Sequence, residues 1–142
     1  NTISGTWMSS FNGYGLRLDS SNRNIISQST AVSNMAASYG LHLNSSSSNS
    51  LTGVFASNPQ GYGAYLSGSS SNTISLSTMT SGSGGEPALY ITGGTSNTIS
   101  GSYMGNSNAN GLGAYFVNTS SNTMSQSAVA GGVVGDAPAV LE

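Results

Sequence analysis

A four-residue phrase recurs six times along the chain, and its spacing constrains the fold more than any other feature of the sequence. The phrase consists of Asn, then Thr, Ile or Ser, then an apolar residue, then Ser or Thr. The apolar members lie 23, 25, 23, 25 and 25 residues apart, and they are Ile3, Ile26, Leu51, Ile74, Ile99 and Met124. A regular period of this size is typical of solenoids, in which each repeat stacks on its neighbours. We therefore predict a stack of short coils, one for each copy of the phrase.

Two further apolar columns accompany the phrase at fixed offsets. Eight residues before each later copy stand Leu18, Leu43, Leu66, Ile91 and Phe116. Five residues after each copy stand Met8, Ala31, Ala56, Met79, Met104 and Val129. Polar residues alternate with apolar ones around the first of these columns, as in strands with one buried face. The pattern predicts an all-β, single-stranded parallel β-helix of about six coils, roughly 25–30 Å tall, without helices.

The repeat is expected to cover residues 1–129, followed by a non-repeat tail over residues 130–142. The tail is predicted either to cap the last coil or to contact another subunit. Because the chain opens on a copy of the phrase, we expect a leader to have been removed or a longer protein to have been cut. Coil length varies among Gly, Ser, Asn and Ala residues only, which predicts a variable loop on one edge of the rod.

The asparagine that opens the phrase has a structural explanation. The later copies are Asn24, Asn49, Asn72, Asn97 and Asn122. Asn tolerates the left-handed backbone of a sharp corner, and stacked amides can hydrogen-bond from one coil to the next. We therefore predict an Asn ladder rather than a ligand site.

The Ser-Ser-Asn-Thr-Ile-Ser phrase, preceded by Gly63-Ala64-Tyr65-Leu66, resembles the repeats of right-handed parallel β-helices of the pectate-lyase-like superfamily. It is most similar to the repeats called periplasmic copper-binding β-helix repeats, over residues 1 to about 129. The resemblance implies a right-handed coil. It implies no function, because lyases, adhesins, surface-layer proteins and phage fibres share this scaffold. The copper in the family name suggests Met8, Met79 and Met104, but Ala and Val share their column, so we predict core packing and no metal site.

Composition excludes several classes of function. The acidic residues are Asp19, Glu86, Asp136 and Glu142, and no two of them occupy the same or adjacent coil positions. A polysaccharide lyase or hydrolase would need paired carboxylates or a calcium cluster, so we predict no enzyme and no cofactor. With two arginines and a net charge of −2, nucleic acid is not an expected partner, and the apolar runs are too short to insert into a membrane. The absence of Cys and the scarcity of Lys favour a secreted or cell-surface protein.

Two outward surfaces are candidate binding or interface sites. Residues between the inward apolar pairs form a column of Arg17, His42, Tyr65, Tyr90 and Tyr115. This column could stabilise its sheet, bury against another protein or stack on sugars, and His42 is expected to be exposed. Hydroxyl side chains flank the apolar anchors on the other candidate face, which comprises Thr73, Ser75, Thr98, Ser100, Thr123 and Ser125. Such regular rows resemble the surfaces of ice-binding solenoids.

These observations predict a non-enzymatic extracellular structural protein that assembles head-to-tail with itself into a filament. The reason is that open solenoid ends present unpaired strand edges, and this chain has few charges to prevent edge pairing. The alternative is a binding module. It would be a glycan-binding adhesin or phage-type fibre fragment that uses the Tyr column, or an ice binder that uses the hydroxyl face.

Overall fold

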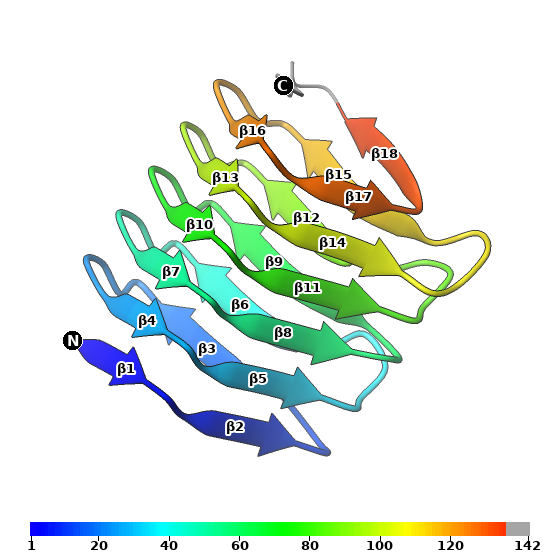
Figure 1. The fold of residues 1–142 in the computed structure, drawn as a ribbon, viewed down its shortest axis with the longest axis horizontal. Coiled ribbons are helices and arrows are strands. Elements are labelled where there is room, and N and C mark those ends of the chain that lie inside the picture. Colours follow the sequence, from blue (N-terminus) through cyan, green and yellow to red (C-terminus); the bar gives the residue numbers. More distant parts are fainter. Residues whose placement is uncertain (136–142) are drawn as a thin grey trace.

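The computed structural model describes residues 1–135 and is a right-handed solenoid with three parallel strands in each coil (Figure 1). The strands form three sheets of six strands each, and each sheet runs the length of the rod. The expectation of an all-β parallel solenoid is confirmed, and all regular structure in the described residues is strand.

The first sheet carries the recurring phrase. Its strands are β1 (Thr2–Ser4), β4 (Ile25–Ser27), β7 (Ser50–Thr52), β10 (Thr73–Ser75), β13 (Thr98–Ser100) and β16 (Thr123–Ser125). The second sheet carries the Met8 column. Its strands are β2 (Trp7–Ser10), β5 (Thr30–Ser33), β8 (Phe55–Asn58), β11 (Thr78–Ser81), β14 (Tyr103–Asn106) and β17 (Ala128–Ala130).

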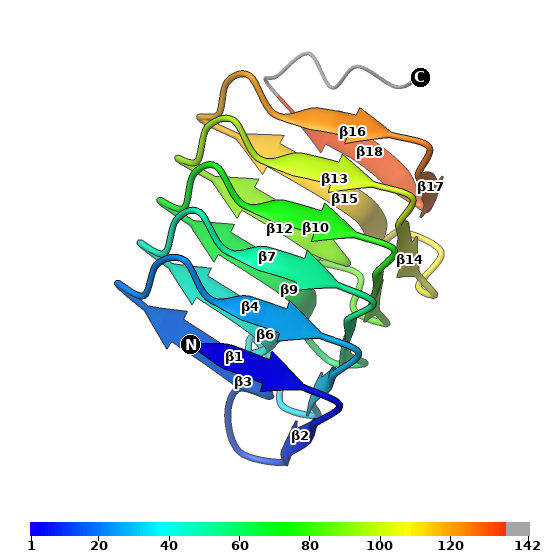
Figure 2. The same cartoon turned by 60° about the vertical axis from the view of Figure 1, so that its left-hand side comes forward.

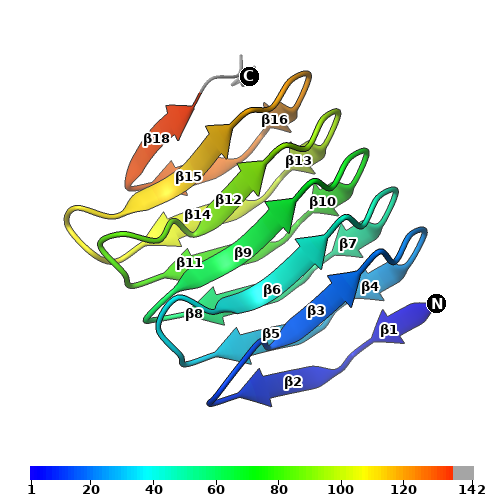
Figure 3. The same ribbon diagram turned by 180° about the vertical axis from the view of Figure 1, so that it is seen from behind.

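The third sheet lies on the opposite side of the rod from the second, as the view from behind shows (Figure 3). Its strands are β3 (Leu16–Asp19), β6 (Tyr39–Asn44), β9 (Tyr62–Ser67), β12 (Leu89–Thr92), β15 (Leu112–Val117) and β18 (Gly132–Gly135). Strand β18 pairs with β15, so the stacking extends past the boundary predicted after residue 129. Residues 136–142, the remainder of the tail predicted over residues 130–142 to cap the last coil or contact another subunit, lie outside the described residues.

The core is a column of apolar side chains along the axis of the rod. The buried members of the predicted core set are Ile26, Leu43, Leu51, Leu66, Ile74, Ile91, Ile99, Phe116 and Met124. Ile3 and Leu18 are partly buried, because they belong to the first coil and pack against the cluster from one side only. Met79 and Met104 pair in register and are buried in the same cluster.

Residues in the left-handed region recur at fixed places in the coils, one at the corner after the first sheet and two in the turn between the third and first sheets. At the corner after the first sheet the column of positive φ includes Gly53 (62°), Leu76 (48°) and Gly101 (54°). A further column falls on Ser48, Ser71, Ser96 and Ser121, directly before the ladder asparagines. These fixed corners account for the constant eight-residue offset between the apolar column of the third sheet and the anchors of the first sheet. The variable loops run between the second and third sheets, where the extra residues of the longer coils project from the edge of the rod (Figure 1).

Candidate functional site

The asparagine column forms a hydrogen-bonded ladder inside the corner between the third and first sheets. Each of these side chains is at most 5% exposed. The amides of Asn24, Asn49, Asn72 and Asn97 each donate to the Oδ1 of the next asparagine, at 2.9–3.1 Å. The same Oδ1 atoms accept the backbone N–H of the preceding asparagine. With donors and acceptors occupied inside the protein, the ladder is a structural element and not a ligand site.

The left-handed backbone was expected at the asparagines themselves, and this expectation is wrong by one position. The left-handed residue is the one before each asparagine, with φ of 56–59° at Ser48, Ser71, Ser96 and Ser121. This placement has a physical reason. The preceding residue turns the chain at the exposed outside of the corner, and the asparagine can then point its amide inward to the ladder.

The outward column of the third sheet is part of a continuous stack of seven rings. The rings are those of Tyr14, Tyr39, His42, Tyr62, Tyr65, Tyr90 and Tyr115. Their centroids are 4.6–5.8 Å apart, and most neighbouring planes are tilted by less than 25°. The flat faces of these rings are therefore covered by neighbouring rings, so the column cannot stack sugars face-on. Arg17 lies beside the stack, with its guanidinium 4.9 Å from the ring of Tyr14.

His42 is buried in this stack, so the expectation of an exposed histidine is wrong. It is only 7% exposed because Tyr39 and Tyr65 lie 4.6 and 5.1 Å from its ring. Sequence reasoning considered one outward column, whereas Tyr14, Tyr39 and Tyr62 supply a second one alongside it. Neither ring nitrogen of His42 has a hydrogen-bond partner within the described residues. Desolvation lowers the pKa of His42, and the positive charge of Arg17 lowers it further.

Charged groups are sparse and dispersed in the described residues. Asp19 accepts from the Asn44 amide at 2.9 Å and pairs with Arg17 at 2.7 Å, and these contacts lower the pKa of Asp19. Glu86 lies in the loop before β12, where Ser83 donates to its carboxylate. Residues 1–135 contain no group of three His, Cys, Asp or Glu side chains that could hold a metal ion.

The hydroxyl rows lie on the first sheet, whose six strands face the viewer in Figure 2. One row aligns Thr73, Thr98 and Thr123, and the other aligns Ser75, Ser100 and Ser125. The rows differ in character, because the threonines are exposed whereas the serines are half-buried. Ile25, at 51% exposure, interrupts the threonine row. Ice binding by this face stays a prediction.

The outer face of the second sheet carries a row that sequence reasoning missed. In register along the six strands stand Trp7, Thr30, Phe55, Thr78, Tyr103 and Ala128. The three aromatic members are exposed to 72%, 40% and 42%, respectively. All six residues follow the apolar anchor by four positions, a signal that was present in the sequence. We call this set the aromatic row.

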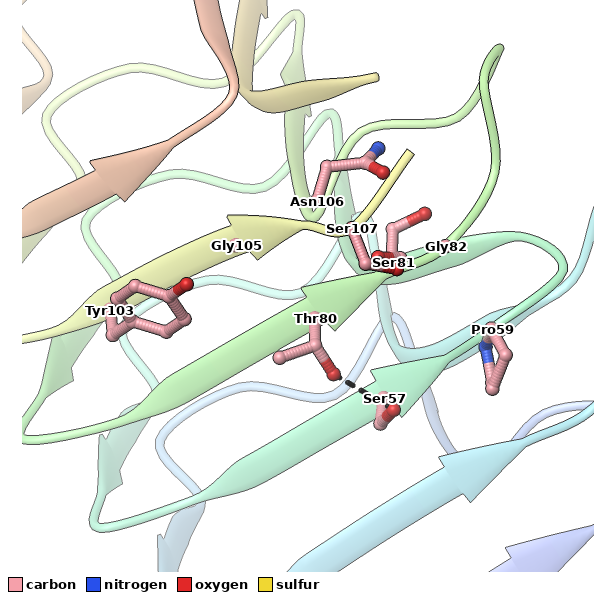
Figure 4. A pocket seen from close by; sticks show the side chains of 9 residues that line it. All are labelled: Ser57, Pro59, Thr80, Ser81, Gly82, Tyr103, Gly105, Asn106 and Ser107. Carbon is pink, nitrogen blue, oxygen red and sulfur yellow. Dashed lines mark hydrogen bonds between the residues drawn. The ribbon is translucent and has the colours of Figure 1, made fainter. Parts of the chain in front are cut away.

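Tyr103, the last aromatic residue of the aromatic row, lies beside an open pocket (Figure 4). Its ring lies over Gly105, where an added Cβ would come within 2.5 Å of ring atoms. Glycine at this position therefore lets the tyrosine lie flat on the sheet. The pocket is lined by Ser57, Pro59, Thr80, Ser81, Gly82, Tyr103, Gly105, Asn106 and Ser107. Within it, the Thr80 hydroxyl donates to Ser57 Oγ at 2.8 Å. The lining offers an aromatic face and neutral polar groups.

None of the described residues forms a helix long and apolar enough to cross a membrane.

Comparison with known proteins identifies the repeat. A family model described as periplasmic copper-binding protein (NosD) matches residues 1–134. Among solved structures, a candidate glycosyl hydrolase from Parabacteroides merdae superposes with a TM-score of 0.64. The alignment covers 99% of this chain and 78% of that one at 7% sequence identity, so it shows a shared fold alone. No curated protein sequence matches the chain at a significant level.

Proposed function

Because the chain belongs to the family described as periplasmic copper-binding protein (NosD), we propose that it is a non-enzymatic β-helix that works outside the cytoplasm and binds glycans on its second sheet. The aromatic row is the observation that carries this proposal. Exposed, flat aromatic side chains in line on a rigid sheet offer apolar faces that fit the C–H faces of sugar rings. Three such residues lie on one face, with threonine hydroxyls between them.

A binding role fits this face better than catalysis does. Hydrolysis or elimination on a glycan requires positioned acid–base groups, commonly a pair of carboxylates. Asp19 lies in β3 of the third sheet, and Glu86 lies in a loop, where Ser83 donates to it. The strands of the second sheet contain only neutral side chains.

Copper does not fit the residues that the structure describes. Soft copper sites use Cys, Met and His ligands that converge on one point. Met79 and Met104 are buried in the core between apolar neighbours, whereas His42 lies in the ring stack on the outside of the third sheet. These ligand types are therefore separated, and no copper chemistry is assigned to this chain.

The test is binding of the purified protein to insoluble neutral polysaccharides, measured by depletion from solution. Wild-type protein is expected to bind, and the triple variant Trp7→Ala, Phe55→Ala, Tyr103→Ala is expected to lose binding by more than tenfold. Phe11→Ala is the matched control, since Phe11 is a 78% exposed aromatic residue in a loop outside the row. Failure of the wild-type protein to bind any polysaccharide, or equal loss in the Phe11 variant, would contradict the proposal.

Head-to-tail assembly is a second candidate function. The first coil favours it, because Ile3, Met8, Leu16 and Leu18 are only partly buried there, and β1, β2 and β3 are the end strands of their sheets. Another coil stacked on this edge would bury those side chains and pair those strands. That coil could come from a second copy or from further residues of a longer chain. Electron microscopy of the purified protein distinguishes the two, since filaments require copies to join, whereas isolated short rods would contradict self-assembly.

A further inference from the structure

The aromatic row has a period of two strands, and this period specifies the kind of glycan that fits it. Aromatic residues stand on β2, β8 and β14, and threonines stand on β5 and β11 between them. Because neighbouring strands are about 4.8 Å apart, successive aromatic rings recur at roughly 9.6 Å along the rod. A ligand that contacts all three rings must therefore present the same face at that interval.

We propose, building on the glycan-binding function above, that the ligand is an extended, neutral β-1,4-linked polysaccharide lying parallel to the solenoid axis. In such a chain each sugar is rotated by half a turn relative to the last, so the same face returns with every second sugar. The length of this two-sugar unit is close to two strand spacings. Alternate sugars would then stack on Trp7, Phe55 and Tyr103, and the sugars between them would lie over Thr30 and Thr78.

The threonines suit the intervening positions chemically. Each has a hydroxyl that can donate to and accept from a sugar hydroxyl. Both are half-buried, and their side chains are shorter than the exposed rings beside them. The contrast between rings and short hydroxyl side chains matches a chain whose sugars alternate in the face they present.

The last ring of the row, that of Tyr103, favours a ligand that lies flat. The tyrosine ring rests over Gly105, and the adjacent pocket continues the contact surface with Ser57 and Thr80. In the next coil the row continues with Ala128, which offers no ring. Toward the later coils, the rings of the row therefore end at Tyr103.

Charge selects among polysaccharides. The six strands of the second sheet carry no charged side chain, so nothing on their outer face would compensate an acidic sugar. Neutral chains such as cellulose, chitin and β-mannan fit this surface. Polygalacturonate does not fit because of its charge, and amylose does not fit because its α-linked chain is helical.

A length series of soluble oligosaccharides tests the spacing. The three rings span four strand spacings, so a trisaccharide reaches two rings and a pentasaccharide reaches all three. By isothermal titration with β-1,4-linked oligosaccharides of two to eight sugars, we expect Kd to fall about tenfold from the di- to the trisaccharide. A second fall of about tenfold is expected from the tetra- to the pentasaccharide, with little change beyond five sugars. A smooth dependence on length, or equal binding of maltooligosaccharides and oligogalacturonides, would overturn the inference.

A variant that keeps the number of rings but changes their phase separates this inference from the broader proposal. Thr30→Phe combined with Phe55→Thr moves the middle ring by one strand and conserves the overall composition of the row. Its pentasaccharide affinity should fall about as far as that of Phe55→Ala, with an unchanged circular dichroism spectrum. Wild-type affinity in the shifted variant would refute the two-strand period and leave glycan binding intact. Absence of binding in the wild-type protein would refute both.

Discussion

Replacing Asn72 by Ala tests whether the asparagine ladder holds the coils together. The Asn72 side chain is fully buried and takes part in four hydrogen bonds. Its amide donates to Asn97 Oδ1 at 3.1 Å and to the Ser46 carbonyl at 3.0 Å. Its oxygen accepts from the backbone N–H of Asn49 at 2.9 Å and from the Asn49 amide at 3.1 Å.

The expected cost follows from these contacts. Each bond contributes about 1 kcal/mol net, and a buried donor left without a partner costs a further 1–3 kcal/mol. Alanine leaves the buried backbone N–H of Asn49 in that state, whereas the Asn49 amide keeps its bond to the Ser21 carbonyl. We therefore expect Asn72→Ala to lower the free energy of unfolding by roughly 5–7 kcal/mol. A loss of that size is a large part of the stability of an ordinary domain.

Urea unfolding followed by circular dichroism measures this loss. Asn34→Ala is the control, because Asn34 is exposed and its side chain accepts a single bond of 3.3 Å from Gln60. The control should change the unfolding free energy by less than about 0.5 kcal/mol. If Asn72→Ala also costs less than 1 kcal/mol, the ladder contributes little and the reasoning fails.

Three further predictions concern single side chains. The pKa of His42 is lowered, so its contribution to stability is present above about pH 6.5 and lost as the pH falls. His42→Tyr should therefore remove this acid sensitivity from thermal melts. An unchanged decrease of the melting temperature at low pH would contradict the prediction. Burial raises the pKa of Tyr62 to about 12, so this tyrosine ionises first in the unfolded chain and stability should fall from about pH 10 to 12. Tyr62→Phe should make that fall less steep in the same thermal melts. Leu76 is 70% exposed with a φ of 48°, where the neighbouring coils have Gly53 and Gly101. Leu76→Gly should be neutral or stabilising by up to about 1 kcal/mol in urea, unlike Leu76→Ala, and a clear loss would contradict a strained corner.

The repeat made the fold predictable because each apolar anchor fixes the register of a whole coil. Ile74 pairs with Ile99 and Leu51, as the 25- and 23-residue spacings require. The position of the left-handed residue was not predictable from the same pattern. Serine occupies the left-handed position in most coils, but it also occurs at the ends of the strands. A serine in the sequence therefore does not mark where the chain turns.

The candidate site was hidden for a different reason. A column is recognised when its members are alike, and the aromatic row alternates Trp, Thr, Phe, Thr and Tyr. Its constant offset of four residues from the apolar anchor was present in the sequence, but the change of residue type from coil to coil concealed it. The Tyr column was visible because it repeats in adjacent coils, yet that repetition is what turns its rings toward one another. Side chains that recur in every coil stack among themselves, and those that recur in every second coil remain available to a ligand.

The asparagine ladder also gives the rod a chemical polarity. Every amide from Asn1 to Asn97 donates to the asparagine of the following coil. The Asn122 amide donates to the Gly94 carbonyl, the same kind of bond to the preceding coil that the Asn97 amide makes with Ser69. A coil added in the same orientation would continue this one-way sequence of donors and acceptors. A coil turned end over end would bring donor to donor or acceptor to acceptor at a buried position. Lengthening of this protein, by duplication of a repeat or by joining of copies, therefore requires every added coil to keep the same orientation.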